Sequence, residues 1–209
     1  LGPHAHSFNL TPDGKLAIAA EFGTDKLMVY DFDAAAGTIK PHDPASVAIA
    51  PGSAPRHTAF GKDGKTLYVL NEITSTIAAL AYDAAKGTFQ DLQTTSTLPA
   101  DFKGNNTAAE LQVHPSGKFL FASNRGHNSI AVLPIGPDGK LGAPKFYPVE
   151  GRPPRNFRLD PSGRWLIVAN QSSNNVVVFA VDQATGALKA NGQTASVRAP
   201  LCIRFWQAE

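Results

Sequence analysis

Four tight turns, each with glycine as its fourth residue, recur along the chain and constrain its fold more than any other feature. They are Thr-Pro-Asp-Gly-Lys, Gly-Lys-Asp-Gly-Lys, His-Pro-Ser-Gly-Lys and Asp-Pro-Ser-Gly-Arg, with their glycines at Gly14, Gly64, Gly117 and Gly163. These glycines are 50, 53 and 46 residues apart. Asp-Gly or Ser-Gly between two short apolar runs is typical of a β-hairpin. Each turn is therefore expected to join the first two strands of a repeated unit.

A second glycine follows each turn glycine after 22 or 23 residues, at Gly37, Gly87, Gly139 and Gly186. An apolar run lies between the two glycines of each unit and predicts a third strand; these runs are 27–30, 77–80, 130–133 and 176–179. The second glycine predicts a turn into a fourth strand. Four short strands in about 50 residues are typical of a β-propeller blade. We predict an all-β chain built of four-stranded antiparallel blades; a β-sandwich with coincidental turns is the alternative.

The predicted units are 1–48, 49–98, 99–149 and 150–198 of a single domain, with 199–209 beginning a further blade. Ala199–Phe205 resembles another first strand, and no completed strand precedes Leu1. The expectation is part of a ring, with a closed four-bladed ring as the alternative. Residues 41–51 and 91–107 are expected to be connections, and the only helical turn is expected near Thr107–Leu111. Exposed blade edges in such an arc favour self-association.

Composition excludes several classes of function. The net charge of +2 is too small to indicate a nucleic-acid or anionic-membrane partner, and no apolar run approaches the roughly 18 residues of a membrane span. Cys202 is the single cysteine, which excludes an intramolecular disulfide framework and is compatible with a cytoplasmic location. Motifs for a nucleophile elbow, a zinc protease, a phosphate loop or a dinucleotide are absent, so no cofactor is predicted. The native N-terminus is not visible in the sequence.

Hairpin geometry brings the polar residues of each unit to one end. If Asp63 and Gly64 form the centre of a two-residue turn, in which both can take positive φ, then Arg56 lies opposite Asn71. By the same count His6 lies opposite Glu21. The charged side chains are therefore expected at the rim opposite the turns.

Residues at equivalent positions of successive blades are expected to ring one mouth of the central channel. Eight positions before the turn glycine stand His6, Arg56, Ala109 and Arg155, and the next position holds His57 and Glu110. Seven and eight positions after it, the sequence has Asn71 with Glu72 and Asn124 with Arg125. Histidine, arginine and glutamate that converge on one pocket indicate a site for an anionic ligand.

Structural roles compete with binding roles at several of these positions. Asn71, like Asn124 and Asn170, is suited to stabilising the turn after the second strand. Glu72 is a possible salt-bridge partner of Arg56, and His57 a possible satisfied polar residue. His4 and His6 share one strand face but have no evident third metal ligand, so no metal is predicted. Arginines facing a channel are costly unless they are paired or used.

The chain resembles the lactonase family of seven-bladed β-propellers. The resemblance rests on His-Ala-His-Ser, Pro-Arg-His with Leu-Tyr-Val-Leu-Asn-Glu, Ala-Glu-Leu with Ala-Ser-Asn-Arg-Gly-His-Asn-Ser-Ile, and Pro-Arg-Asn-Phe with Val-Ala-Asn-Gln. The family includes propeller-type 6-phosphogluconolactonases and the fungal carboxymuconate-lactonising enzyme. The resemblance implies that about four of seven blades are present and that the missing blades are N-terminal.

The same resemblance implies catalytic roles for His6, Arg56, Glu72 and one arginine. Arg155 is taken as that arginine, although Arg125 fits the role equally well from the sequence. The candidate substrate-binding residues are His4, His57, Asn71, Glu110 and Arg125.

This set of residues suits hydrolysis of a lactone without a cofactor. His6 or Glu72 is the candidate general base, Arg56 is placed to stabilise an oxyanion, and Arg125 or Arg155 to hold a phosphate or carboxylate. The expected substrate is a small anionic sugar lactone, and 6-phosphogluconolactone is preferred. A carboxymuconate-type cycloisomerase and a non-catalytic binding propeller are the alternatives.

Overall fold

The computed structural model describes residues 2–206, and this part of the chain forms four antiparallel sheets of four strands each, with no helix. The four sheets confirm the predicted all-β class and the blade-like units. The strands are β1 (Ala5–Leu10), β2 (Leu16–Glu21), β3 (Lys26–Asp33), β4 (Thr38–Ala48), β5 (Pro55–Phe60), β6 (Thr66–Asn71), β7 (Thr76–Asp83), β8 (Thr88–Ser96), β9 (Thr107–Val113), β10 (Phe119–Arg125), β11 (Ser129–Pro134), β12 (Lys145–Pro148), β13 (Pro154–Leu159), β14 (Trp165–Asn170), β15 (Asn175–Val181) and β16 (Leu188–Ser196).

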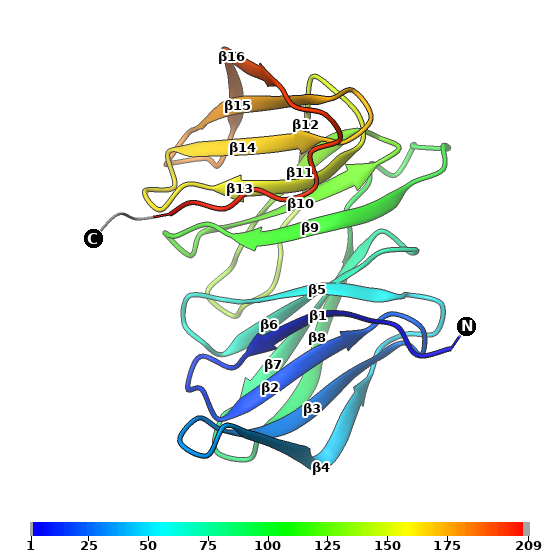
Figure 1. Ribbon diagram of the computed structural model, residues 1–209, viewed down its shortest axis with the longest axis vertical. Helices are drawn as coiled ribbons and strands as arrows, with labels where there is room; N and C mark the ends of the chain where they lie inside the picture. Colours follow the sequence, from blue (N-terminus) through cyan, green and yellow to red (C-terminus); the bar gives the residue numbers. More distant parts are fainter. Residues whose placement is uncertain (1, 207–209) are drawn as a thin grey trace.

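The sheets are arranged as an open arc of propeller blades. Consecutive strands pair within each sheet, so the first strand lies at one edge and the fourth at the other. The first strands contact one another in the order β1, β5, β9 and β13, and they therefore line a common inner side. The first and fourth sheets lie at opposite ends of the molecule, so the described residues do not form the closed four-bladed ring (Figure 1).

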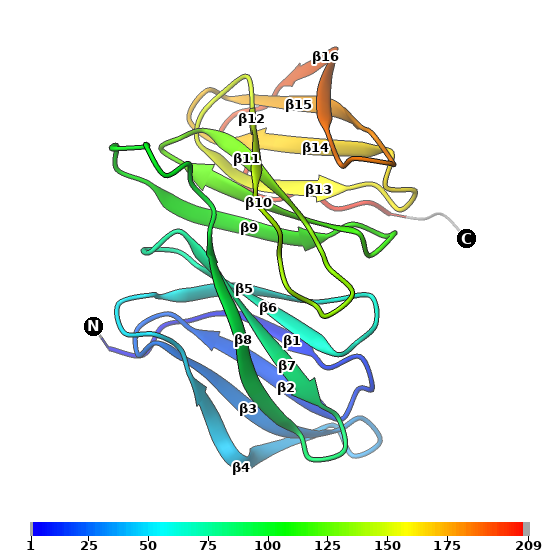
Figure 2. The ribbon, with the colours of Figure 1, turned by 180° about the vertical axis from the view of Figure 1, so that it is seen from behind.

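Apolar faces of neighbouring sheets pack against each other. Ile18 and Leu27 of the first sheet pack with Leu67 and Val69 of the second, and comparable clusters join the second to the third sheet and the third to the fourth. The second strand of the first three sheets is buried along almost its whole length, whereas β4 and β16 are largely exposed. Seen from behind, the fourth strands β8 and β12 of the two middle sheets face the viewer (Figure 2).

The predicted hairpin turns are present, but their geometry differs from the expected two-residue form. The amide of Gly64 donates to the carbonyl of Gly61, and the amide of Gly61 donates to the carbonyl of Thr66. Gly64 has φ of 68°, whereas Asp63 is not among the residues with positive φ. The turn therefore needs glycine only at position 64. Asp63 stabilises the turn in another way, because its side chain accepts a hydrogen bond from the amide of Lys65.

A β-bulge at the rim corrects the predicted register. Pro55 lies opposite Asn71 and His57 opposite Leu70, so Arg56 is the extra residue between them. In the first sheet Ala5, not His6, lies opposite Glu21, and His6 is the extra residue. The fourth sheet repeats the bulge at Arg155. A bulge bends the strand and re-aims the extra side chain, which alters the simple alternation of faces.

Four further segments differ from their expected structure. Thr107–Leu111 is not a helical turn but part of β9. Residues 41–48 and 91–96 complete β4 and β8, because their pairing with the third strands continues past an irregularity. Residues 199–206 form no strand, although the amide of Ile203 donates to Asn156 of β13. Residues 207–209 of the expected further blade lie outside the described part.

Within residues 2–206 there is no helix of the length and apolarity that a membrane span requires.

Candidate active site

A pocket of about 360 Å³ opens at the rim where the bulges lie. It is lined by His4, Ala5, His6, Phe22, Arg56, Glu72, Arg125 and Arg155. These residues come from the starts of the first strands and from the ends of the second strands or just beyond them. Six of the nine candidate residues therefore meet at one place, which we call the axial pocket.

Glu72 links two of the three arginines of the axial pocket. Its Oε2 lies 2.6 Å from Nε of Arg56, and its Oε1 lies 2.7 Å from Nη2 of Arg125. Arg56 also donates from Nη1 to the carbonyl of Ala109, and Arg125 donates from Nη2 to the carbonyl of Ala108 at 3.0 Å. The salt bridge considered between Arg56 and Glu72 is present. Backbone and carboxylate together hold both guanidinium groups in fixed positions.

The axial pocket carries an excess of positive charge. Three guanidinium groups face one carboxylate, and Arg56 is only 3% exposed. Burial lowers the pKa of Arg56 to about 10, so this side chain remains a cation at neutral pH. Arg155 forms neither an ion pair nor a side-chain hydrogen bond with any described residue. An unpaired arginine in a concave pocket favours an anionic ligand.

His6 stands at the mouth of the axial pocket as a neutral imidazole. Contact with its neighbours desolvates the ring, although much of the residue stays open to solvent. This desolvation, followed by the charge of Arg56, lowers the pKa of His6 to about 4. Its ring meets the ring of His57 edge to face, with the centroids 5.0 Å apart. At neutral pH His6 therefore offers a nitrogen lone pair to the pocket.

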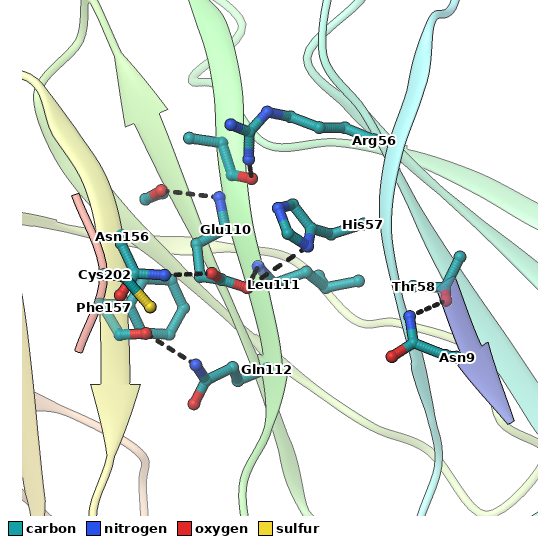
Figure 3. A network of polar contacts seen from close by, with 12 residues as sticks. Asn9, Arg56, His57, Thr58, Glu110, Leu111, Gln112, Asn156, Phe157 and Cys202 are labelled. Carbon is teal, nitrogen blue, oxygen red and sulfur yellow. Dashed lines mark hydrogen bonds and ion pairs between the residues drawn. The ribbon is translucent and has the colours of Figure 1, made fainter. Parts of the chain in front are cut away.

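His57 and Glu110 lie one residue deeper along β5 and β9 and do not line the axial pocket. Nδ1 of His57 is 3.9 Å from Oε1 of Glu110, and Asn156 donates a hydrogen bond to Oε2 of the same carboxylate (Figure 3). Desolvation, followed by the charge of Arg56, lowers the pKa of His57 to about 3. These two candidates therefore support the pocket from beneath.

Asn71 is placed away from the axial pocket. It is 1% exposed and donates from Nδ2 to the hydroxyl of Thr76 across the following turn. Asn124 and Asn170 are equally buried and donate to the carbonyls of Thr97 and Val149. The predicted turn-stabilising role holds for Asn71 and for Asn124, which also donates to the hydroxyl of Ser129, whereas Asn170 bonds instead to the segment after the preceding sheet.

Glu21 is not a partner of His6, contrary to the predicted register. Its carboxylate accepts hydrogen bonds from the amides of His4 and Gly23 and from the hydroxyl of Thr24. Although burial opposes it, these donors lower the pKa of Glu21. His4 lines the pocket, but its Nδ1 hydrogen-bonds with the carbonyl of Gly2. Glu21 therefore fixes the backbone just before β1 and just after β2.

Three contributors were not singled out from the sequence. Phe22 lines the pocket from the repeat position that Glu72 and Arg125 occupy in their units, so the repeat alignment did contain that signal. Asn156 shares its repeat position with His57 and Glu110 and bonds to the latter. Arg204 belongs to the segment that was expected to begin a further blade, and its charge helps to lower the pKa of His57. Across residues 2–206, no group of three or more His, Cys, Asp or Glu side chains is arranged to hold a metal ion.

Comparison with known families gives a match over nearly the whole chain. The family model described as "Lactonase, 7-bladed beta-propeller" matches residues 1–205. A curated relative from Bacillus subtilis (strain 168) called 6-phosphogluconolactonase is 35% identical over 204 residues. The aligned region covers 97% of this chain and 57% of that relative. The chain thus spans a little over half the length of this relative.

Solved structures give the same result. A periplasmic gluconolactonase from Pseudomonas aeruginosa is 35% identical, with a TM-score of 0.90 over 97% of this chain and 56% of the other. A protein from Lactobacillus plantarum is also 35% identical, with a TM-score of 0.92 over 99% of this chain and 59% of the other. The arc of four sheets is therefore an arrangement that longer proteins also contain.

Proposed function

Because the chain belongs to the lactonase family of seven-bladed β-propellers, we propose that the whole protein hydrolyses a sugar-acid lactone, with 6-phosphogluconolactone as its substrate. The observation that carries the proposal is the axial pocket, where Glu72 fixes two arginines and a third is left unpaired. The name of the Bacillus subtilis relative supports the choice of a phosphorylated substrate. At about 360 Å³, the pocket is within the usual size range of small-molecule sites.

Arg155 is the residue that we assign to the substrate's phosphate. Arg125 fits the sequence criteria equally well, but its Nη2 is engaged by Glu72 and by the carbonyl of Ala108. Arg155 lines the same pocket and has no such partner in the described chain. A free guanidinium group can bind two phosphate oxygens at once, which fixes the orientation of the sugar.

Arg56 is the residue that we assign to the oxyanion of the tetrahedral intermediate. Its Nε and Nη1 are occupied by Glu72 and Ala109, which leaves Nη2 as the group available to the pocket. A buried cation that is already held in place needs little rearrangement when negative charge develops on the carbonyl oxygen. Glu72 acts as the anchor of this cation, since both of its oxygens are engaged by guanidinium groups.

His6 is the residue that we assign as general base. It accepts a proton from the attacking water while the water oxygen bonds to the lactone carbonyl carbon. Collapse of the tetrahedral intermediate breaks the bond to the ring oxygen, and His6 returns the proton to that oxygen. The products are a hydroxyl group and a carboxylic acid on the opened chain, and the acid releases its proton to solvent at neutral pH to become a carboxylate. No covalent enzyme intermediate and no metal ion take part in this scheme, so a chelator should leave the rate unchanged.

A carboxymuconate-type cycloisomerase is a less favoured use of the same groups. The related reaction also needs a base and cations for carboxylates, so the pocket alone does not decide between the two. The relatives named 6-phosphogluconolactonase and gluconolactonase favour hydrolysis.

We further propose a cytoplasmic location, which rests on the single Cys202. Because one similar structure is of a periplasmic protein, fractionation of the native cell is the test of this location.

The test is turnover by the whole protein of three substrates, namely 6-phosphogluconolactone, unphosphorylated gluconolactone and a carboxymuconate. We expect fastest hydrolysis of the phosphorylated lactone and no change with a chelator. Turnover of the carboxymuconate alone would support the cycloisomerase. Binding of 6-phosphogluconate without turnover of any substrate would support a non-catalytic propeller.

A further inference from the structure

Three potential donors converge on the carboxylate of Glu110, beneath the axial pocket. The amide of Leu111 donates to Oε1 at 3.0 Å, Asn156 donates from Nδ2 to Oε2, and Nδ1 of His57 lies 3.9 Å from Oε1 (Figure 3). The backbone of Glu110 is fixed as well, because its amide donates to the hydroxyl of Ser123. A carboxylate offers an acceptor to the Leu111 amide and another to Asn156, and its negative charge faces Nδ1 of His57, which at 3.9 Å is beyond hydrogen-bond distance.

The orientation of Asn156 is itself determined by a hydrogen bond. The amide of Ile203 donates to Oδ1 of Asn156 at 2.8 Å. Its Nδ2 must therefore point to Glu110, which is 8% exposed. A continuous set of contacts thus runs from residue 203 through Asn156, Glu110 and His57 to the ring of His6.

The side chains of Asn156, Glu110 and His57 lie between two cavities. Arg56 and Arg155 line the axial pocket, whereas Thr58 and Arg158, two and three residues further along the same strands, line a second cavity of about 660 Å³. His57 lies between Arg56 and Thr58 on β5. It is therefore close to the axial pocket without lining it, and His6 is its only aromatic neighbour in the described residues.

We propose that Glu110 is a positioning residue, whose carboxylate holds the ring of His57 in one orientation and one tautomer, and that this ring in turn orients His6. A neutral histidine carries its single proton on either nitrogen, and a carboxylate beside Nδ1 selects the Nδ1–H form. The effect of Glu110 on the reaction rate rests on the function proposed above, whereas its effect on the His57 tautomer does not.

Charged groups from each neighbouring element act on Glu110. Arg56 lies on the same strand as His57, Arg158 lies on β13, and Arg204 follows β16. Burial outweighs these cations and the Leu111 amide and raises the pKa of Glu110. The ionised carboxylate selects the tautomer of His57. The selection is therefore strongest at pH values above the pKa of Glu110 and weakens as the pH falls below that pKa.

The test is ¹⁵N NMR of histidine-labelled whole protein, with and without Glu110→Gln. We expect the wild type above the Glu110 titration to show His57 as the Nδ1–H tautomer, and the variant to show a mixture or the Nε2–H form. Glu150→Gln makes the same chemical change at an exposed loop position and should leave the His57 tautomer unchanged.

Steady-state kinetics provide the second readout. In Glu110→Gln, kcat should fall roughly 10-fold to 100-fold with KM nearly unchanged, a loss of the size seen when the partner that orients a metal-ligating histidine is removed. If the wild type hydrolyses no lactone, the proposed function fails while the NMR experiment still tests this inference.

Asn156→Asp provides a second variant of nearly unchanged size in case Glu110→Gln does not fold. It keeps the acceptor for the Ile203 amide but presents a second carboxyl group to Glu110 in place of the donor. Glu110 should then hold its proton to higher pH, and the change of His57 tautomer should move to higher pH with it. A folded variant of either kind in which the His57 tautomer matches the wild type at every pH through the titration of Glu110 would overturn the proposal.

Discussion

Glu72 determines which arginines remain available to a ligand. By pairing with Arg56 and Arg125 it turns two cations into part of the pocket wall, and Arg155 keeps its full hydrogen-bonding capacity. The sequence alignment of the repeat placed all three arginines at one rim. It could not rank them, because the ranking depends on which side chain reaches the single carboxylate.

Arg155→Gln is expected to weaken binding of the phosphorylated lactone. A hydrogen bond to a charged group contributes about 1.5–3 kcal/mol, so KM should rise roughly 10-fold to 100-fold while kcat changes less. Arg152→Gln, which removes an exposed arginine three residues earlier, is the matched control. An equal loss with unphosphorylated gluconolactone would show that Arg155 does not bind the phosphate.

His6 gives the proposed reaction a defined dependence on pH. A general base acts only when deprotonated, and the pKa of His6 in the free protein is about 4. The value of kcat/KM should therefore stay constant from neutral pH downward and fall only as the pH drops through about 4. A limb near the ordinary histidine pKa of about 6.5 would mean that another group is the base.

The β-bulge is the element that aims these side chains. It places His6, Arg56 and Arg155 as extra residues in β1, β5 and β13. Counting residues back from the turn predicted the rim correctly but misplaced the pairing by one residue, because a uniform ladder was assumed. The bulge has no glycine or other local signature in these three strands, so only the structure reveals it.

The turn glycines of the repeat lend themselves to a stability test. Gly14 has φ of 69°, and an added Cβ there would meet no atom within 4 Å. Gly14→Ala should therefore lower the free energy of unfolding by about 1–2 kcal/mol through backbone strain alone. Gly14→Asn should cost less, because asparagine tolerates positive φ better. Urea unfolding of both variants makes the comparison, and equal losses would contradict this account of the turn.

At the scale of the whole molecule, the two end sheets are less covered than the middle ones. Phe8 and Leu10 of β1 are 54% and 45% exposed, and Trp165 of β14 is 39% exposed. The repeat in the sequence predicted the stack of sheets, because its glycines and apolar runs repeat in step. It wrongly predicted a first strand at 199–205, because that segment matches the repeat in sequence but has no second strand beside it, and residues 199–206 form no strand.

The 209-residue chain by itself is expected to self-associate through these end sheets. Exposed apolar side chains and unpaired strand edges both favour pairing with a second copy. Light scattering after size-exclusion chromatography should show a mass that rises with protein concentration. Phe8→Lys combined with Trp165→Lys should reduce it, and a concentration-independent monomer of the wild-type chain would rule this expectation out.

We propose that the axial pocket of the whole protein hydrolyses a phosphorylated sugar lactone. The most direct test of this claim is decay of 6-phosphogluconolactone in an assay coupled to a dehydrogenase, comparing the whole protein, its Arg56→Ala variant and the spontaneous background. We expect clear acceleration by the wild type and a kcat roughly 10²–10³-fold lower in the variant, as when one oxyanion donor is removed. No acceleration by the wild type, or an equal rate in a folded Arg56→Ala variant, would contradict the claim.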